Sequence, residues 1–193
     1  MPADRLRLGV CGGLALLPLL SACGAGDGSG EFYTRWDLDG GCTSDQTGAD
    51  RSDAYGEPVD VCEYAGPGWV WVTYAAGWCS ASRNQAPQVH RFARSARRDV
   101  AVFTVLTGGP EIGVPATQRD ARSWANAHGL PAERVLYESE EGGRTIPQHL
   151  LLGPDGRTWY RYVGYLDAEA MHRLLEEFAD GQRAPSVRDL PVP

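Results

Sequence analysis

A single cysteine stands where a buried strand is expected to give way to a helix. The segment TYAAGWCSASRNQAP, residues 73–87, places Cys79 directly after Trp78. The first turn of a helix leaves backbone N–H groups without partners, and the helix dipole favours an anion there. A thiolate in such a position has a lowered pKa and is the nucleophilic form of the sulfur. The pattern predicts a reactive Cys79, with Trp78 shielding one side of its sulfur.

The residue three positions after Cys79 limits the chemistry. In a Cys-x-x-Cys motif the second cysteine resolves the mixed disulfide that the first one forms. Ser82 occupies that position here, so resolution within the motif cannot occur. The sequence predicts a monothiol that an external thiol must release, with Ser82 placed to donate a hydrogen bond to the thiolate.

The elements that must position this cysteine alternate between strands and helices. Apolar and β-branched runs predict buried strands at 68–76 and 100–108, and a short strand at 134–138. Helical periodicity predicts helices over 82–98, 116–128 and 167–180, the first with Pro87 inside it. Two apolar runs joined by Gly-Pro-Asp-Gly predict a hairpin over 146–164. The expected fold class is α/β, a mixed central sheet flanked by helices.

The same segments resemble the thioredoxin superfamily, and within it the exported TlpA-like and redoxin thiol–disulfide oxidoreductases. YAAGWCSAS is similar to their strand followed by Trp-Cys-x-x-Cys, and Pro87 matches their kinking helix proline. GGRTIPQHLLLGPDGRTWYRYVG is similar to their cis-proline segment and hairpin. The resemblance implies a thioredoxin-like fold, a cis Pro147 that shapes the substrate groove, and Ile146 facing the sulfur. DLDGG and VDVCEYAG resemble the N-terminal β-hairpin extension of exported members.

The N-terminus indicates export. Residues 1–22 have a basic start, a short apolar run and small residues at the end, as a signal peptide does. Leu20-Ser21-Ala22-Cys23 resembles a bacterial lipobox, which implies an acylated Cys23. Residues 23–34 then form the acylated cysteine and a flexible tether, 35–181 the thioredoxin-like domain, and 182–193 a loose tail. The predicted location is the cell envelope, as a membrane lipoprotein facing the periplasm or exterior; an ordinary signal peptide that contains a cysteine is the alternative.

Export makes disulfides persistent, so the remaining cysteines must be paired. Cys11 leaves with the signal and Cys23 is used for the lipid, which leaves three cysteines. Cys42 and Cys62 bracket a polar loop, and a bridge between them would contribute on the order of 3 kcal/mol. The alternative is that one of them acts as a distant resolving cysteine for Cys79.

Charge and histidine spacing argue against several other functions. The net charge of −7 does not suit a nucleic-acid partner. The four histidines have no metal-ligand spacing, so neither a metal nor a cofactor is expected. The expected partners are exported protein thiols or disulfides, or low-molecular-weight thiols. The acidic residues nearest the expected site are Glu63, Glu138, Glu140 and Glu141, and the inward positions of strand 68–76 include no carboxylate.

Two other functions stay open at this point. A thiol peroxidase would oxidise Cys79 to sulfenic acid, but the Thr-x-x-Cys arrangement is missing because Ala76 stands three residues before the cysteine. A redox-inactive binding module would instead use the groove beside Pro147 to bind an extended peptide by strand addition.

Overall fold

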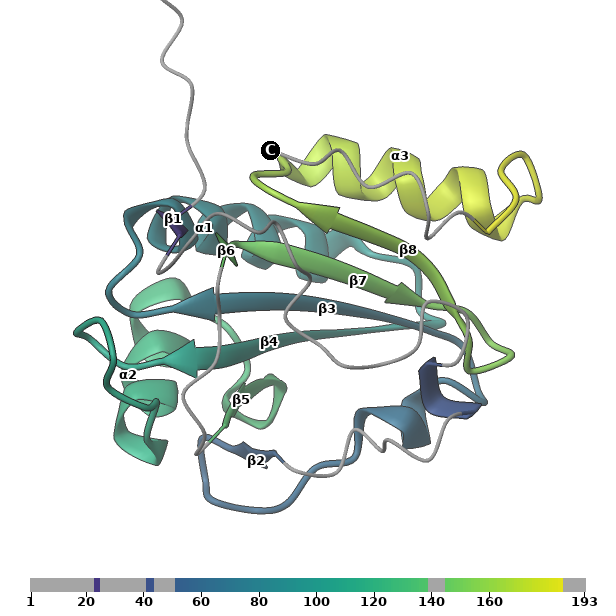
Figure 1. Ribbon diagram of the computed structural model, residues 1–193. Coiled ribbons are helices and arrows are strands. Elements are labelled where there is room, and N and C mark those ends of the chain that lie inside the picture. The colour runs from purple at the N-terminus through teal and green to yellow at the C-terminus, as the bar shows by residue number, and fades with distance from the viewer. Residues whose placement is uncertain (1–22, 25–40, 44–50, 139–144, 186–193) are drawn as a thin grey trace, which may run out of the picture.

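The computed structural model describes residues 23–24, 41–43, 51–138 and 145–185. A six-stranded mixed sheet has the order β2-β5-β4-β3-β7-β8 (Figure 1). Its strands are β2 (Ser52–Asp53), β3 (Trp69–Ala76), β4 (Val100–Gly108), β5 (Val135–Tyr137), β7 (Gln148–Leu152) and β8 (Thr158–Val163). A separate two-stranded pair joins β1 (Cys23–Gly24) to β6 (Thr145–Ile146). The α/β class expected from the sequence is confirmed.

The centre of the sheet is formed by β3. All eight of its residues are buried, which explains why its sequence is a continuous apolar run rather than an alternating one. It pairs in parallel with β4 and antiparallel with β7. The parallel β3 and β4 therefore both end at the edge of the sheet where Cys79 follows.

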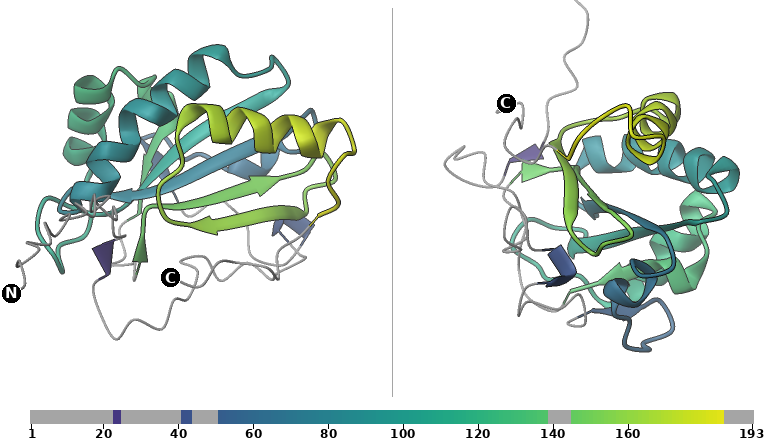
Figure 2. Two further views of the ribbon diagram at one scale, coloured as in Figure 1. Left: turned by 90° about the horizontal axis from the view of Figure 1, so that it is seen from above. Right: turned by 90° about the vertical axis from the view of Figure 1, so that its right-hand side faces the viewer.

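Different elements pack against the two faces of the sheet. α1 (Ser80–Ser95), α2 (Gln118–His128) and α3 (Ala168–Ala179) all contribute to one apolar cluster with alternate residues of β3, such as Trp71. Figure 2 shows the three helices on one side of the sheet. The opposite face contains Val70, Val72 and Tyr74, and the turn Val61–Tyr64 (η2) packs against it. Cys79 belongs to this second cluster.

The helix boundaries follow local capping chemistry. Thr117 and Asp120 form a capping box at the start of α2, and Gly129 ends it with a φ of 66°. Asp167 caps α3 by accepting from the Ala170 N–H. The sequence predicts the first helix over 82–98, but α1 begins at Ser80 because Cys79 itself is the N-cap residue. It ends at Ser95, since Ala96 already has an extended backbone.

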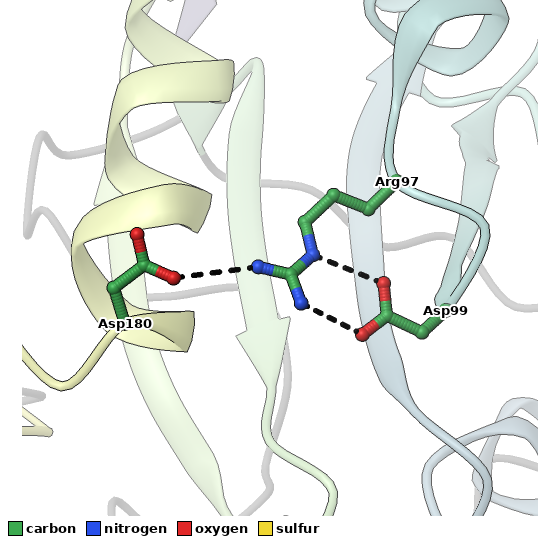
Figure 3. A network of polar contacts seen from close by, with 3 residues as sticks. All are labelled: Arg97, Asp99 and Asp180. Carbon is green, nitrogen blue, oxygen red and sulfur yellow. Dashed lines mark hydrogen bonds and ion pairs between the residues drawn. The ribbon is translucent and has the colours of Figure 1, made fainter.

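Two polar contacts tie the first helix region to the last. The Gln85 amide donates to the Leu166 carbonyl at 2.6 Å and accepts from the Leu166 N–H at 2.8 Å. Beyond the end of α1, the Arg97 guanidinium pairs with Asp99 and lies 3.6 Å from Asp180 at the end of α3 (Figure 3). The Gln85 contacts are buried and the Arg97 contacts are exposed, so Gln85 carries more of the stability.

The described part of the predicted N-terminal hairpin consists of 3-10 turns rather than paired strands. Gly41–Thr43 (η1) and Val61–Tyr64 (η2) contain Cys42 and Cys62, which are joined by a disulfide with a Cα–Cα distance of 5.5 Å. Asp60 starts η2 because its carboxylate accepts from the Cys62 N–H at 2.8 Å. The signal peptide, most of the tether, Glu140, Glu141 and the end of the tail lie outside the described residues.

Candidate redox site

Cys79 is the N-cap residue of α1. Its sulfur accepts a hydrogen bond from the Ser82 N–H at 3.4 Å and lies 3.6 Å from the Ile146 carbonyl oxygen. The residue is fully buried. The sulfur therefore faces the positive end of the helix, where backbone N–H groups and the dipole favour negative charge.

The oxidation state of this sulfur differs from the sequence expectation. Cys79 is disulfide-bonded in the structure, whereas the sequence reasoning treated it as an unpaired thiol once Cys42 and Cys62 were joined. With Cys23 assigned to the lipid and Cys11 to the signal peptide, the sequence offers no cysteine partner for Cys79 besides Cys42 and Cys62.

Ser82 contacts the site through two different groups. Its backbone N–H points to the Cys79 sulfur, while its side-chain oxygen accepts from the Ala76 N–H at 3.3 Å. The hydroxyl thus holds the end of β3 against the first turn of α1. The hydrogen bond to the sulfur comes from the Ser82 backbone N–H, not from the hydroxyl that the sequence suggested.

Trp78 is held between two loops at the ends of β3 and β4. Its backbone N–H donates to the Gly109 carbonyl at 2.9 Å, and the backbone N–H of the preceding Gly77 donates to the Gly108 carbonyl at 3.0 Å. A Cβ on Gly108 would lie 2.8 Å from the Trp78 indole nitrogen. Glycine at this position therefore lets the half-buried indole pack beside Cys79.

The segment before β7 forms the other side of the site. The peptide bond between Ile146 and Pro147 is cis, the form that the family resemblance implied for Pro147. The Pro147 carbonyl accepts from the Gly164 N–H at 2.8 Å. Ile146 is fully buried and its carbonyl faces the sulfur of Cys79.

Comparison with solved structures identifies proteins of similar architecture. A thioredoxin-family thiol:disulfide interchange protein from Chlorobium tepidum aligns with a TM-score of 0.53 at 16% identity, covering 69% of this chain and 96% of that one. The pneumococcal exposed lipoprotein thioredoxin from Streptococcus pneumoniae aligns with a TM-score of 0.54 at 22% identity, covering 69% and 99%. A thioredoxin-like protein from Aeropyrum pernix aligns with a TM-score of 0.53 at 14% identity, covering 68% and 88%.

The fold is thioredoxin-like. No family model matches the chain, and no curated protein matches it in sequence. At identities below 25% the solved structures show the thioredoxin-like fold alone, so the chemistry has to be argued from the residues of this site.

A buried histidine lies on the helix-covered face of the thioredoxin-like sheet. His149 accepts at Nδ1 from the Trp71 indole at 3.3 Å, and the Thr73 hydroxyl lies 3.1 Å from the same nitrogen. Complete burial lowers the pKa of His149 to about 3, so the ring is neutral. Trp71 and Cys79 belong to clusters on opposite faces, so the histidine has a packing role away from the sulfur.

The opposite face holds a buried ion pair that the sequence reasoning missed. Arg51 donates to the Glu138 carboxylate at 2.5 Å, and the guanidinium lies 5.9 Å from the centre of the Tyr74 ring. Burial raises the pKa of Tyr74 above its usual range, so its hydroxyl stays protonated. Glu63, in contrast, is exposed. Arg51 lies in a polar stretch with no periodicity, so the sequence carried no signal that would have paired it with Glu138.

Among the described residues no group of three or more His, Cys, Asp or Glu side chains is placed to hold a metal ion. In the same part of the chain, no helix has the length and apolar character needed to cross a membrane. Within these described ranges, the chemistry at the C-terminal edge of β3 centres on Cys79.

Proposed function

We propose that this protein carries out thiol–disulfide exchange through Cys79. The observation that carries the proposal is the sulfur at the N-terminus of α1, which accepts the Ser82 N–H and lies against the Ile146 carbonyl. The helix N-terminus stabilises a thiolate as attacking or leaving group. The disulfide at Cys79 is the oxidised form of such a site.

The exchange step is a displacement at sulfur. The Cys79 thiolate attacks one sulfur of a client disulfide, the new bond joins Cys79 to that half of the client, and the other half leaves as a thiolate that takes a proton. Ser82 has no sulfur, so a second thiol from outside the motif must attack the mixed disulfide. Ile146 and Trp78 flank the sulfur and would contact the incoming client.

The proposed setting is the cell envelope, with residues 1–22 as signal peptide, an acylated Cys23 as the anchor and residues 35–181 as the domain that carries Cys79. The lipobox and the resemblance to exported TlpA-like proteins support this. One of the similar structures is described as an exposed lipoprotein thioredoxin. Radiolabelled fatty acid should enter the parent chain in a bacterial host and not a Cys23→Ser variant; equal labelling of the two would contradict the anchor.

Capture of glutathione tests the exchange chemistry. The full chain with Cys11→Ser and Cys23→Ser, which leaves Cys42, Cys62 and Cys79 as its cysteines, is the parent for this test. It is reduced, mixed with glutathione disulfide, quenched with acid and weighed intact. A mixed disulfide should form at Cys79 and disappear in Cys79→Ser, while the Cys42→Ala/Cys62→Ala variant should keep it. Equal adduct on the Cys79→Ser and parent chains would refute the proposal.

Ser82→Cys provides a second test. In the same Cys11→Ser/Cys23→Ser parent, a cysteine at position 82 would supply a resolving sulfur next to Cys79, so the glutathione adduct should fall at least tenfold and a disulfide within the motif should replace it. An adduct that persists unchanged, with no new internal disulfide, would mean that the first turn of α1 does not support exchange.

A redox-inactive peptide-binding module is the second candidate, and one observation favours it. β6 pairs antiparallel with β1, so the strand just before Pro147 accepts an added strand. If Cys79→Ser still retained a client peptide that the parent chain binds, with unchanged affinity, the binding role would replace the exchange role.

A further inference from the structure

The disulfide partner of Cys79 can be narrowed by elimination. The chain has five cysteines. Cys42 and Cys62 are joined to each other, and Cys79 is also disulfide-bonded. Within this chain its partner must therefore be Cys11 or Cys23.

Backbone placement distinguishes these two. Cys23 lies in β1, where its backbone is paired antiparallel with that of Ile146, and Gly24 is paired with Thr145. β1 also contacts α1. Residues opposite each other in an antiparallel pair have Cα atoms about 4.5–5.5 Å apart, and the Ile146 carbonyl lies 3.6 Å from the Cys79 sulfur. The backbone of Cys23 and the sulfur of Cys79 are therefore both neighbours of Ile146, and a disulfide requires Cα atoms about 4.4–6.8 Å apart.

We propose that Cys23 is the disulfide partner of Cys79 in the chain that is not acylated, and that it supplies there the second sulfur that Ser82 lacks. β1 lies on β6 as an added strand, which is the position that an extended client peptide would take. Cys79 is fully buried in this arrangement, so a client reaches the sulfur only after the segments that cover it have moved.

The role of Cys23 as a resolving cysteine rests on the proposed function, whereas the pairing itself does not. In that role the Cys23 thiolate attacks the Cys79 sulfur of a mixed disulfide. The Cys23–Cys79 bond forms, the bond to the client breaks, and the client leaves as a thiolate that takes a proton. The two thiols of the protein have then given two electrons to the client disulfide, and a dithiol reductant must return them.

One sulfur cannot serve both the disulfide and the lipid. Acylation at Cys23 converts its thiol to a thioether, which can neither attack Cys79 nor stay bonded to it. In the acylated chain, Cys79 is therefore a free thiol without a disulfide partner. In the chain without lipid, Cys79 and Cys23 form a pair that can be oxidised to a disulfide. Acylation decides which of the two forms exists.

Thiol counting tests the pairing. The full chain is made in a membrane-free, oxidising cell-free system, unfolded without reductant, alkylated and weighed. Arginine-specific digestion leaves Cys11 and Cys23 in one peptide, because no arginine lies between Arg7 and Arg35. Cys11→Ser is therefore the reference chain.

The expected outcomes are specific. The Cys11→Ser chain should take up no alkyl group, and Cys11→Ser/Cys23→Ser should take up one, at Cys79. Cleavage after Glu63 separates Cys62 from Cys79, so the linked peptides can be assigned by mass. Two alkyl groups on the Cys11→Ser chain, at Cys23 and Cys79, would overturn the pairing.

A second readout separates this inference from the proposed function. The reduced Cys11→Ser/Cys23→Ser chain should accumulate a glutathione adduct at Cys79 at least tenfold above that of Cys11→Ser, because the resolving sulfur is gone. Equal adduct on both would overturn the resolving role of Cys23 while exchange at Cys79 stands. Absence of adduct on both, with the Cys23–Cys79 link present, would refute the exchange function and leave the pairing intact.

Discussion

The two ends of β3 each have a disulfide-bonded cysteine, and their surroundings differ. Before the strand begins, Cys62 lies in η2, where the carboxylate of Asp60 accepts its N–H. After the strand ends, Cys79 caps α1 and its sulfur accepts an N–H. Figure 1 shows η1 and η2 at one end of the sheet and β1 with β6 at the other.

The difference shows how local charge separates a bracing disulfide from a reactive one. The Asp60 carboxylate, which accepts the Cys62 N–H, puts a negative charge in the same turn and so disfavours a thiolate at Cys62. The N-terminus of α1 instead favours a thiolate at Cys79. The first bond is suited to hold η1 and η2 together, and the second to be exchanged.

Removing the bracing disulfide should have the largest effect on stability. The Cys42→Ala/Cys62→Ala chain should lose about 3 kcal/mol of unfolding free energy, since the bond closes a loop with a sequence separation of 20. Urea unfolding measures the loss, and glutathione capture by Cys79 should be unchanged. If the folded variant also lost the glutathione adduct at Cys79, the two disulfides would not have the separate roles proposed for them.

The next largest effect is a pH-dependent loss of unfolding free energy that arises at the middle of β3, where Thr73 lies beside His149. Burial lowers the pKa of His149 from its ordinary value of about 6.5 to about 3. Between these pH values the unfolded chain binds more protons than the folded one, so stability falls as the pH falls. The contribution lost from pH 7 to pH 5 is about 2 kcal/mol. Urea unfolding at both pH values should show it.

His149→Gln is the matched variant for this measurement. It removes the titrating ring but keeps a polar side chain, so its unfolding free energy should change less between pH 7 and pH 5 by the same amount. If the unfolding free energies of the parent and the variant changed equally with pH, the buried ring of His149 would not be the cause of this pH dependence.

The order of reduction should separate the two disulfides directly. In thiol–disulfide buffers, the bond at Cys79 should open at a thiol-to-disulfide ratio at least tenfold lower than the Cys42–Cys62 bond, because the helix N-terminus stabilises the reduced thiolate. Tenfold corresponds to about 1.4 kcal/mol. Alkylation and peptide mass at each ratio measure it, and the reverse order would contradict the proposed electrostatic difference.

The smallest expected effect is at Ser82. Ser82→Ala removes the acceptor of the Ala76 N–H and should cost about 1 kcal/mol of stability. The backbone N–H that reaches the sulfur remains, so the rate of glutathione capture should change by less than about twofold. A much larger drop in that rate would assign the hydroxyl a direct role at the sulfur.

Much of the fold could be predicted from the sequence because its strongest patterns are local. The buried run at 68–76 forms β3. Gly129 ends α2 because it adopts a left-handed backbone, and Asp167 begins α3 because its side chain caps the helix. The sequence predicts the start of α1 two residues too late. The apolar pattern that indicates a helix begins inside α1, whereas the residue that caps it is Cys79. The sequence predicts a strand where η2 lies, since nothing in its composition distinguishes a short strand from a capped turn.

The candidate site could be predicted only in part from the sequence. Cys79, Trp78 and Pro147 stand out by residue type and spacing. The contact of Cys79 with Ile146 and the pairing of β1 with β6 join segments far apart in the sequence. A motif within one segment carries no information on such contacts, so the oxidised state of Cys79 could not be derived from it.

The Gln85 contacts have a consequence for how the molecule opens. One amide side chain binds both backbone groups of Leu166, so the first half of α1 and the loop before α3 cannot separate without breaking two buried hydrogen bonds. These segments should open as one cooperative unit, and their amide hydrogens should exchange with deuterium at a shared rate. A client that binds at Cys79 would thus meet a site in which α1 stays attached to the loop before α3 through Gln85.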